Sequence, residues 1–218
     1  MLLILARHGN TFGPGDTPVW GGAHEDLPLV ESGLEQSREI GRAIRDAGLV
    51  LDRILAGPLK RTRTGARLAA EKCGFAGEVE IDERLKEIDY GVWGGKTDGE
   101  VAEQWNQGTI DAWRERSIPP EGAGWSPSPA TIQADVRAVL ASVTRNLSQD
   151  NKVLIVTSNG ILRYFHKLLA EDGAAQGSTN VKTGHMCAFN VTRAEATLSV
   201  WNADASEFRS VMAKSLEN

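Results

Sequence analysis

The sequence is poor in cysteine and in long apolar runs. Its 218 residues include only Cys73 and Cys187, which stand far apart and in no spacing typical of a metal site. This usage favours a reducing compartment, so we expect a cytoplasmic protein. No apolar run approaches the ~20 residues that a membrane-spanning helix requires. The N-terminal MLLILA lacks a basic segment and meets Arg7 too soon for a signal peptide, so no membrane partner is expected.

Excess positive charge, internal repeats and low-complexity tracts are also absent. The formal net charge is −5, which argues against a general nucleic-acid surface but not against one local basic pocket. With 41% hydrophobic and 24% charged residues, the composition is that of an ordinary globular protein. Four of the eight prolines fall within residues 117–130, which indicates a loop or the edge of an insertion. We therefore predict a single domain over residues 1–218, with a variable insertion near residues 98–130.

Short apolar runs alternate with helical patterns along the chain. Runs typical of buried parallel strands occupy residues 2–6, 51–57 and 152–157. Helical patterns follow them at residues 32–48, 58–74 and 159–173. Two further apolar runs, at residues 186–191 and 196–202, predict a terminal hairpin. This alternation predicts an α/β fold, a three-layer sandwich with a mostly parallel central sheet.

Local signals suggest where the three helices begin and end. A capping box of Ser32 and Glu35 is expected to open the first helix. Pro58 is expected in the first turn of the second, and Gly173 at the end of the third.

The three strand ends carry residues that suit an anion. The first strand ends in ARHGNT, where Gly9 lets the backbone turn directly after Arg7 and His8. The second places Arg61 one helical turn further on, and the third runs through the Ser-Asn-Gly turn at Asn159 into a helix. Ligands of parallel sheets bind at the carboxyl ends of the strands. Guanidinium groups and a helix N-terminus together favour a phosphate there.

This set of residues also contains a nucleophile. A neutral imidazole such as that of His8 can attack phosphorus and then carry the phosphoryl group. The departing alkoxide then needs a proton from an acid. The segment of residues 83–97 offers Glu83, Glu87 and Asp89 for that role.

Five motifs in one order give the chain a family resemblance. LARHGNT, LPLVESGLEQSREIG, GPLKRTRTGARLAA, RLKEIDYGVWGGKT and VLIVTSNGILRYF together resemble the histidine phosphatase superfamily, the phosphoglycerate mutase-like group. The resemblance implies that fold and a phosphohistidine mechanism. His8 would then be the nucleophile, Arg7 and Arg61 would bind the phosphate, and Glu87 would be the proton donor.

The chain departs from the family pattern at four positions. Asn10 stands where relatives usually have Glu, Pro14 where they have a phosphate-contacting Asn, and Gly94 where they have a carboxylate. Asn159 replaces the second pocket histidine. Its amide can still donate a hydrogen bond to a phosphate oxygen, or it can simply cap the following helix.

Other residues are expected to complete the pocket. We expect phosphate or substrate to contact Asn10, Thr11, Asn159 and His185. His185 is the first candidate to replace the missing histidine, and Lys182 is the second. Trp105, Trp113 and Trp125 lie in the variable segment that would cover the pocket, where they either stack on a sugar or base or pack the insertion.

The sequence therefore predicts a metal-independent phosphomonoesterase without a cofactor, acting on a small phosphorylated molecule. A phosphoglycerate mutase-type phosphotransferase is one alternative, and the short segment after Gly95 weighs against it. A non-catalytic module that binds a phospholigand is the other; Asn159, Pro14 and Gly94 favour it. The sequence does not set the oligomeric state, and a homodimer is one candidate.

Overall fold

A computed structural model of the chain describes residues 1–145, 148, 150–170, 178–192 and 195–216. In this part of the chain, six strands form one sheet in the order β3-β2-β4-β1-β5-β6. The parallel strands are β1 (Leu2–Arg7), β2 (Arg53–Ala56), β3 (Val79–Ile81) and β4 (Lys152–Thr157). The hairpin of β5 (Met186–Val191) and β6 (Ala196–Ala203) adds to β1 in the antiparallel sense. The three predicted parallel strands and the predicted hairpin are confirmed.

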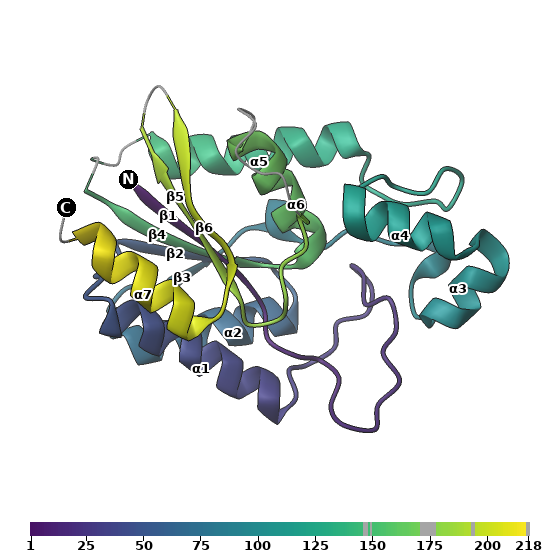
Figure 1. The fold of residues 1–218 in the computed structure, drawn as a ribbon, viewed down its shortest axis with the longest axis horizontal. Helices are drawn as coiled ribbons and strands as arrows, with labels where there is room; N and C mark the ends of the chain where they lie inside the picture. The colour runs from purple at the N-terminus through teal and green to yellow at the C-terminus, as the bar shows by residue number, and fades with distance from the viewer. Residues whose placement is uncertain (146–147, 149, 171–177, 193–194, 217–218) are drawn as a thin grey trace.

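Helices cover both faces of the sheet (Figure 1). One face carries α1 (Glu31–Asp46), α2 (Lys60–Cys73) and α7 (Ala205–Leu216), and the other carries α5 (Pro129–Thr144) and α6 (Asn159–Leu169). Successive side chains of β1 alternate between the two hydrophobic cores, since Leu3 and Leu5 pack on one side and Ile4 and Ala6 on the other. The predicted three-layer α/β sandwich is confirmed.

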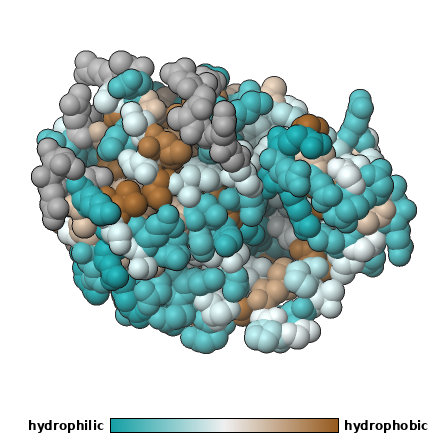
Figure 2. All heavy atoms as spheres, viewed as in Figure 1, coloured by the Kyte–Doolittle hydropathy of each residue, from teal (hydrophilic) through white to brown (hydrophobic). Residues whose placement is uncertain are grey.

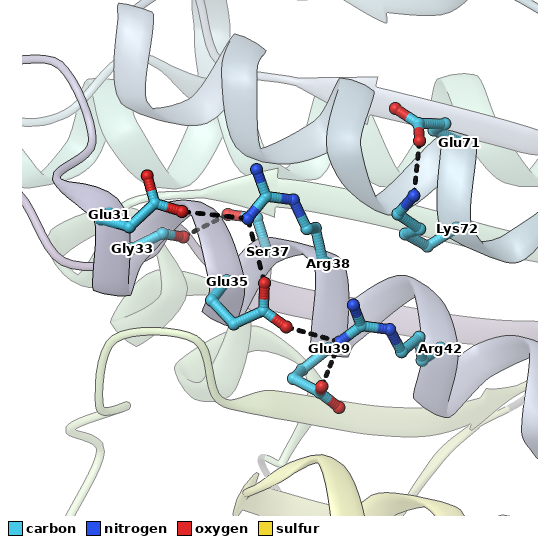
Figure 3. A network of polar contacts seen from close by, with 9 residues as sticks. All are labelled: Glu31, Gly33, Glu35, Ser37, Arg38, Glu39, Arg42, Glu71 and Lys72. Atoms are coloured by element: carbon cyan, nitrogen blue, oxygen red, sulfur yellow. Dashed lines mark hydrogen bonds and ion pairs between the residues drawn. The ribbon is translucent and has the colours of Figure 1, made fainter.

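The ends of the helices differ from the predicted ones. Helix α1 begins at Glu31, and its N-cap residue Val30 makes no side-chain capping bond, so the predicted capping box is wrong. Ser32 lies inside the helix instead, and Glu35 pairs with Arg38 and Arg42 on the exposed face (Figure 3).

Two further boundaries also move. Pro58 precedes Leu59, the N-cap of α2, so it lies outside that helix and not in its first turn. Helix α6 ends at Leu169, with Ala170 as its C-cap, and Gly173 lies outside the described residues. None of the helices in the described ranges has the length and apolar character needed to cross a bilayer.

The segment after Gly95 forms a helical lobe beside the sandwich, at the right of Figure 1. Helix α3 (Asp98–Trp105) opens with a capping box of Thr97 and Glu100, and α4 (Gln107–Arg116) follows at once. Short 3-10 turns at Glu83–Leu85 and Gly91–Trp93 lead into this lobe, which we call the cap.

Aromatic rings pack together between the cap and the sheet. The cluster consists of Trp20, Tyr90, Trp93, Trp105, Trp113 and Trp125, with neighbouring ring centroids 4.7–6.5 Å apart. Packing, one of the two predicted uses of the tryptophans in the variable segment, is confirmed. The cluster anchors the cap at a fixed place above the ends of the strands.

Candidate active site

A cavity of about 780 Å³ opens at the carboxyl ends of β1, β2 and β4. Figure 2 shows the surface hollowed between the body of the sandwich and the cap. Seven of the eight predicted site residues lie on its wall: Arg7, His8, Asn10, Thr11, Arg61, Glu87 and Asn159. The eighth, His185, does not.

His8 is held in one protonation state by its surroundings. Its backbone N–H donates to the Thr157 carbonyl at 3.1 Å, which continues the pairing of β1 with β4. Its Nδ1 lies 2.8 Å from the carbonyl oxygen of Gly9, and a carbonyl can only accept, so Nδ1 carries the hydrogen. Burial, with the charges of Arg7 and Arg61, lowers the pKa of His8 well below its ordinary value. The imidazole is therefore neutral at pH 7, and its Nε2 carries a free lone pair.

The residue after His8 must be glycine for a steric reason. A Cβ added at Gly9 would lie 2.2 Å from the Gly33 carbonyl oxygen, because the end of β1 presses on the first turn of α1. Asn10 continues this contact, since its backbone N–H donates to Gln36 Oε1 at 2.8 Å. The N-terminus of α1 thus fixes the turn that presents His8.

The two predicted phosphate-binding arginines are held by carbonyl groups. Arg7 donates from Nη1 to the Val181 carbonyl at 2.6 Å, and burial lowers the pKa of Arg7, while the nearby Glu87 opposes that shift. Arg61 donates to the carbonyls of Gly21, Gly22 and Glu25 at 2.7–3.1 Å. Within the described ranges, neither makes an ion pair of 4.0 Å or less, so the positive charge remains available to an anion.

Among the three predicted acids, Glu87 alone lines this cavity. The carboxylate is buried, and one oxygen accepts from the backbone N–H of Gly160 at 3.2 Å, at the N-terminus of α6. Glu83 is exposed. Asp89 pairs with His24 at 3.1 Å beside a smaller cavity of about 240 Å³.

Asn159 is not the cap of α6, because Ser158 takes that position. The Asn159 Oδ1 accepts from the backbone N–H of Val181, and its Nδ2 donates to Asn180 Oδ1, both at 2.9 Å. The interpretation of Asn159 as a helix cap is therefore wrong. Its amide fastens α6 to the segment that leads into β5.

The structure does not bring His185 or Lys182, the predicted replacements for a second pocket histidine, to the cavity. His185 donates from Nδ1 to the Asn202 carbonyl at 2.8 Å and so turns toward β6. Lys182 is exposed and also lies outside the cavity wall. We correct this expectation: the hydrogen bond to the Asn202 carbonyl of β6 holds the His185 ring off the cavity wall.

Sequence reasoning missed Arg163, a buried arginine on the cavity wall. It donates to the carbonyls of Trp113 and Arg114 at 3.0 Å each, and to the hydroxyls of Ser117 and Thr179 at 2.8–2.9 Å. It therefore joins α6 to the C-terminus of the cap helix α4. Its position, four residues after Asn159 and so on the same helix face, was the available signal.

The mouth of the cavity carries a balanced pair of charges. Arg114 donates from Nη2 to both carboxylate oxygens of Asp98 at 2.7–2.8 Å. Trp20 donates from Nε1 to the same carboxylate at 3.0 Å, and the Arg114 guanidinium lies 5.6 Å from the Trp20 ring centroid. This side of the mouth is therefore aromatic, and its two charges neutralise each other. Within the described ranges, no three or more His, Cys, Asp or Glu side chains gather as they would around a metal ion.

Comparison with known proteins identifies the family. Residues 3–204 match the histidine phosphatase superfamily, branch 1. The chain belongs to this superfamily. The family inferred from the five motifs is confirmed.

Sequence relatives within the histidine phosphatase superfamily include mutases. A 2,3-bisphosphoglycerate-dependent phosphoglycerate mutase of Parvibaculum lavamentivorans is 36% identical over 124 residues, which cover 56% of this chain and 58% of that protein. A probable phosphoglycerate mutase GpmB of Erwinia tasmaniensis is 30% identical over 158 residues, 71% of this chain and 68% of that protein. The chain thus spans less than two thirds of the first of these relatives.

Solved structures with the same fold include phosphatases. A mycobacterial glucosyl-3-phosphoglycerate phosphatase is 20% identical and superposes with a TM-score of 0.76, covering 93% of this chain and 99% of that one. An alpha-ribazole phosphatase from Shigella flexneri is 23% identical with a TM-score of 0.65, covering 93% and 96%. At these identities the likeness concerns the fold, so the reaction must be argued from the site.

Proposed function

We propose that this chain is a phosphatase that hydrolyses a small phosphomonoester through a phosphohistidine on His8. The observation that carries the proposal is the neutral His8, whose Nε2 is left free by the hydrogen bond from Nδ1 to the Gly9 carbonyl. Arg7 and Arg61, which make no ion pair among the described residues, share its cavity with the buried carboxyl group of Glu87.

Two steps account for the reaction. The Nε2 lone pair of His8 forms a bond to phosphorus while the bond from phosphorus to the ester oxygen breaks, and protonated Glu87 gives its proton to the leaving oxygen. Water then attacks the phosphohistidine and loses a proton to the Glu87 carboxylate, which releases phosphate and restores His8. Arg7 and Arg61 stabilise the charge on the transferring oxygens throughout. No cofactor enters either step.

The charge of the cavity mouth favours hydrolysis over mutase chemistry. A phosphoglycerate carries a carboxylate besides its phosphate and needs a further cation near the entrance. Arg114 is neutralised there by Asp98, and the two terminal nitrogens of Arg163 already donate to the cap. This balance supports a substrate whose alcohol portion is uncharged.

Retention of both nucleophile and acid also weighs against a module that only binds a phospholigand. Such a module needs the arginines, but it has no use for an imidazole held with a free Nε2 or for a carboxyl group buried on the same wall.

Trapping the intermediate tests the proposal. Brief incubation with 4-nitrophenyl phosphate, followed by an alkaline quench, should leave phosphate on the peptide that contains His8. His8→Ala should abolish both the trapped phosphate and the hydrolysis. His24→Ala is the matched control and should retain both, since that side chain is 73% exposed and lies outside the main cavity. Hydrolysis that survives His8→Ala, or phosphate on a serine or aspartate, would overturn the mechanism.

A further inference from the structure

The segment of residues 179–184, which leads into β5, contacts the site at nearly every residue. Arg7 donates to the Val181 carbonyl, Thr183 donates to Asn10 Oδ1, and Gly184 donates from its backbone N–H to the carbonyls of Arg7 and His8. Asn180 and Thr183 both lie on the cavity wall. This segment is therefore a structural part of the phosphate pocket.

Two hydrogen bonds determine which way the Asn180 amide faces. The backbone N–H of Val181 can only donate, so the atom of Asn159 that it meets is the acceptor Oδ1. The remaining amide atom of Asn159 is then Nδ2, a donor, and the atom of Asn180 that it meets must be Oδ1. The Val181 N–H thus orients the Asn159 amide, which in turn orients the Asn180 amide.

The Asn180 Nδ2 group, which carries two N–H donors, is the last group in this series of hydrogen bonds. The Asn180 Nδ2 has no hydrogen-bond partner among the described residues, although Asn180 is half-buried. The next residue along the chain, Val181, accepts from Arg7, so Asn180 lies beside the arginine that we assign to the phosphate.

We propose that Asn180 donates from Nδ2 to an oxygen of the transferring phosphoryl group and so replaces the histidine that relatives carry at position 159. The proposal rests on the phosphatase function above. Asn159 is then a positioning residue: it makes no bond to the substrate, and it holds the Asn180 donor in the direction of the cavity. Two asparagines, one that positions and one that donates, then share the role that the family resemblance assigns to one histidine.

One variant, Asn180→Asp, distinguishes a phosphate-binding role of Asn180 from a purely structural role of the two asparagines. Asn180→Asp keeps the shape of the side chain and the Oδ1 that accepts from Asn159, and it replaces only the free Nδ2 with an oxygen. If the pair merely fastens the segment, this variant should fold like the wild type, and its turnover should fall only by the repulsion of the new charge, which added salt weakens. If Nδ2 serves the phosphoryl group, the same variant loses a donor and gains a charge that repels the substrate.

The experiment compares hydrolysis of 4-nitrophenyl phosphate with the binding of orthovanadate, a mimic of the transition state. Loss of one preorganised donor typically lowers kcat by about 10²–10³. We expect at least this loss for Asn180→Ala and Asn180→Asp, with orthovanadate binding weakened in parallel and the melting temperature of Asn180→Asp close to that of the wild type. Asn190→Asp adds the same charge at the exposed far end of β5 and should change neither measurement. Wild-type turnover and orthovanadate binding in both Asn180 variants would overturn the proposal.

A second variant pair tests the division of roles. Asn159→His should recover activity in the Asn180→Ala background, because an imidazole at position 159 can itself reach the phosphate. Failure to recover any activity would contradict the replacement.

The experiments distinguish failure of the phosphatase proposal from failure of the Asn180 proposal. If the wild type forms no phosphohistidine and hydrolyses no ester, the phosphatase function fails. Calorimetric titration of the same proteins with inorganic phosphate then still tests the donor, since Asn180→Asp should weaken that binding whether or not catalysis follows.

Discussion

At the scale of single residues, the site depends on keeping one histidine neutral between two cations. Burial disfavours the charged imidazole, and Arg7 and Arg61 add to that effect. The low pKa of His8 must also make the free energy of unfolding depend on pH. In the unfolded chain His8 binds a proton near pH 6.5, whereas in the folded protein it does not.

The pKa of His8 therefore predicts a loss of stability in mild acid. Because its folded pKa lies below its unfolded pKa, the stability that His8 confers is full above about pH 6.5 and falls as the pH decreases. Between about pH 7.5 and 5.5 the free energy of unfolding should lose up to about 1.4 kcal/mol from this residue. Urea unfolding of the wild type and of His8→Gln at both pH values measures the difference.

His166, whose pKa burial also lowers, remains in both proteins and cancels in that comparison. An equal loss in the wild type and in His8→Gln would contradict the assignment of a low pKa to His8.

At the scale of elements, the first turn of α6 unites several parts of the site. Asn159 orients Asn180, and the Gly160 N–H donates to Glu87 Oε2. Gly160 allows this approach because it has no side chain: a Cβ there would lie 2.2 Å from Glu87 Oε1. The turn thus determines the position of the Glu87 carboxyl group.

Gly160→Ala should therefore reproduce the loss of the acid. The methyl group displaces the Glu87 carboxyl group, so hydrolysis of an alkyl phosphate should fall by about 10²–10⁴, as it should in Glu87→Gln. A nitrophenyl ester should lose far less, because its phenolate leaves without a proton. Steady-state kinetics on the two substrates gives the ratio, and an equal loss on both would mean that Gly160 serves only packing.

The sequence predicted those elements whose signals are local. The sequence predicts β1 and β4 as continuous apolar runs because both faces of these strands are buried. Strand β3 has only three residues, with an exposed Glu80 at its centre, and gives no such signal. The motifs predict His8, Arg61 and Glu87, and all three line the cavity, whereas the contacts of Asn159 depend on Val181, 22 residues away. Contacts at that range are set by the packing of whole elements.

At the scale of the whole molecule, one arginine connects the α/β sandwich to the cap. Arg163 satisfies two carbonyls in the last turn of α4 and lies 4.9 Å from the Trp113 ring centroid. Helix C-termini leave such carbonyls without partners in their own helix. The cap is thus held to α6 by bonds that no other cation in the described residues makes.

Arg163→Met should loosen the cap. It leaves the Arg114 carbonyl without its donor, which typically costs about 1–3 kcal/mol, whereas the Trp113 carbonyl keeps the bond from the Ser117 N–H, and the free energy of unfolding in urea should fall accordingly. The KM for ester substrates should rise, since the cap forms one side of the cavity. Arg116→Met is the control on the same helix, because its side chain is 61% exposed and its ion pair is 3.9 Å long. Equal stability of the two variants would show that the aromatic cluster alone holds the cap.

Five of the six tryptophans belong to that aromatic cluster, and Trp20 and Trp113 also line the cavity. Indole rings with centroids 4.8–6.2 Å apart exchange excitation energy, so light absorbed by one of them is shared by its neighbours. The sixth, Trp201, lies apart from this cluster against His166. The intrinsic fluorescence of the protein is therefore dominated by the tryptophans at the cap. A ligand that binds beside Trp20 should change this fluorescence, so its binding can be measured without any added dye.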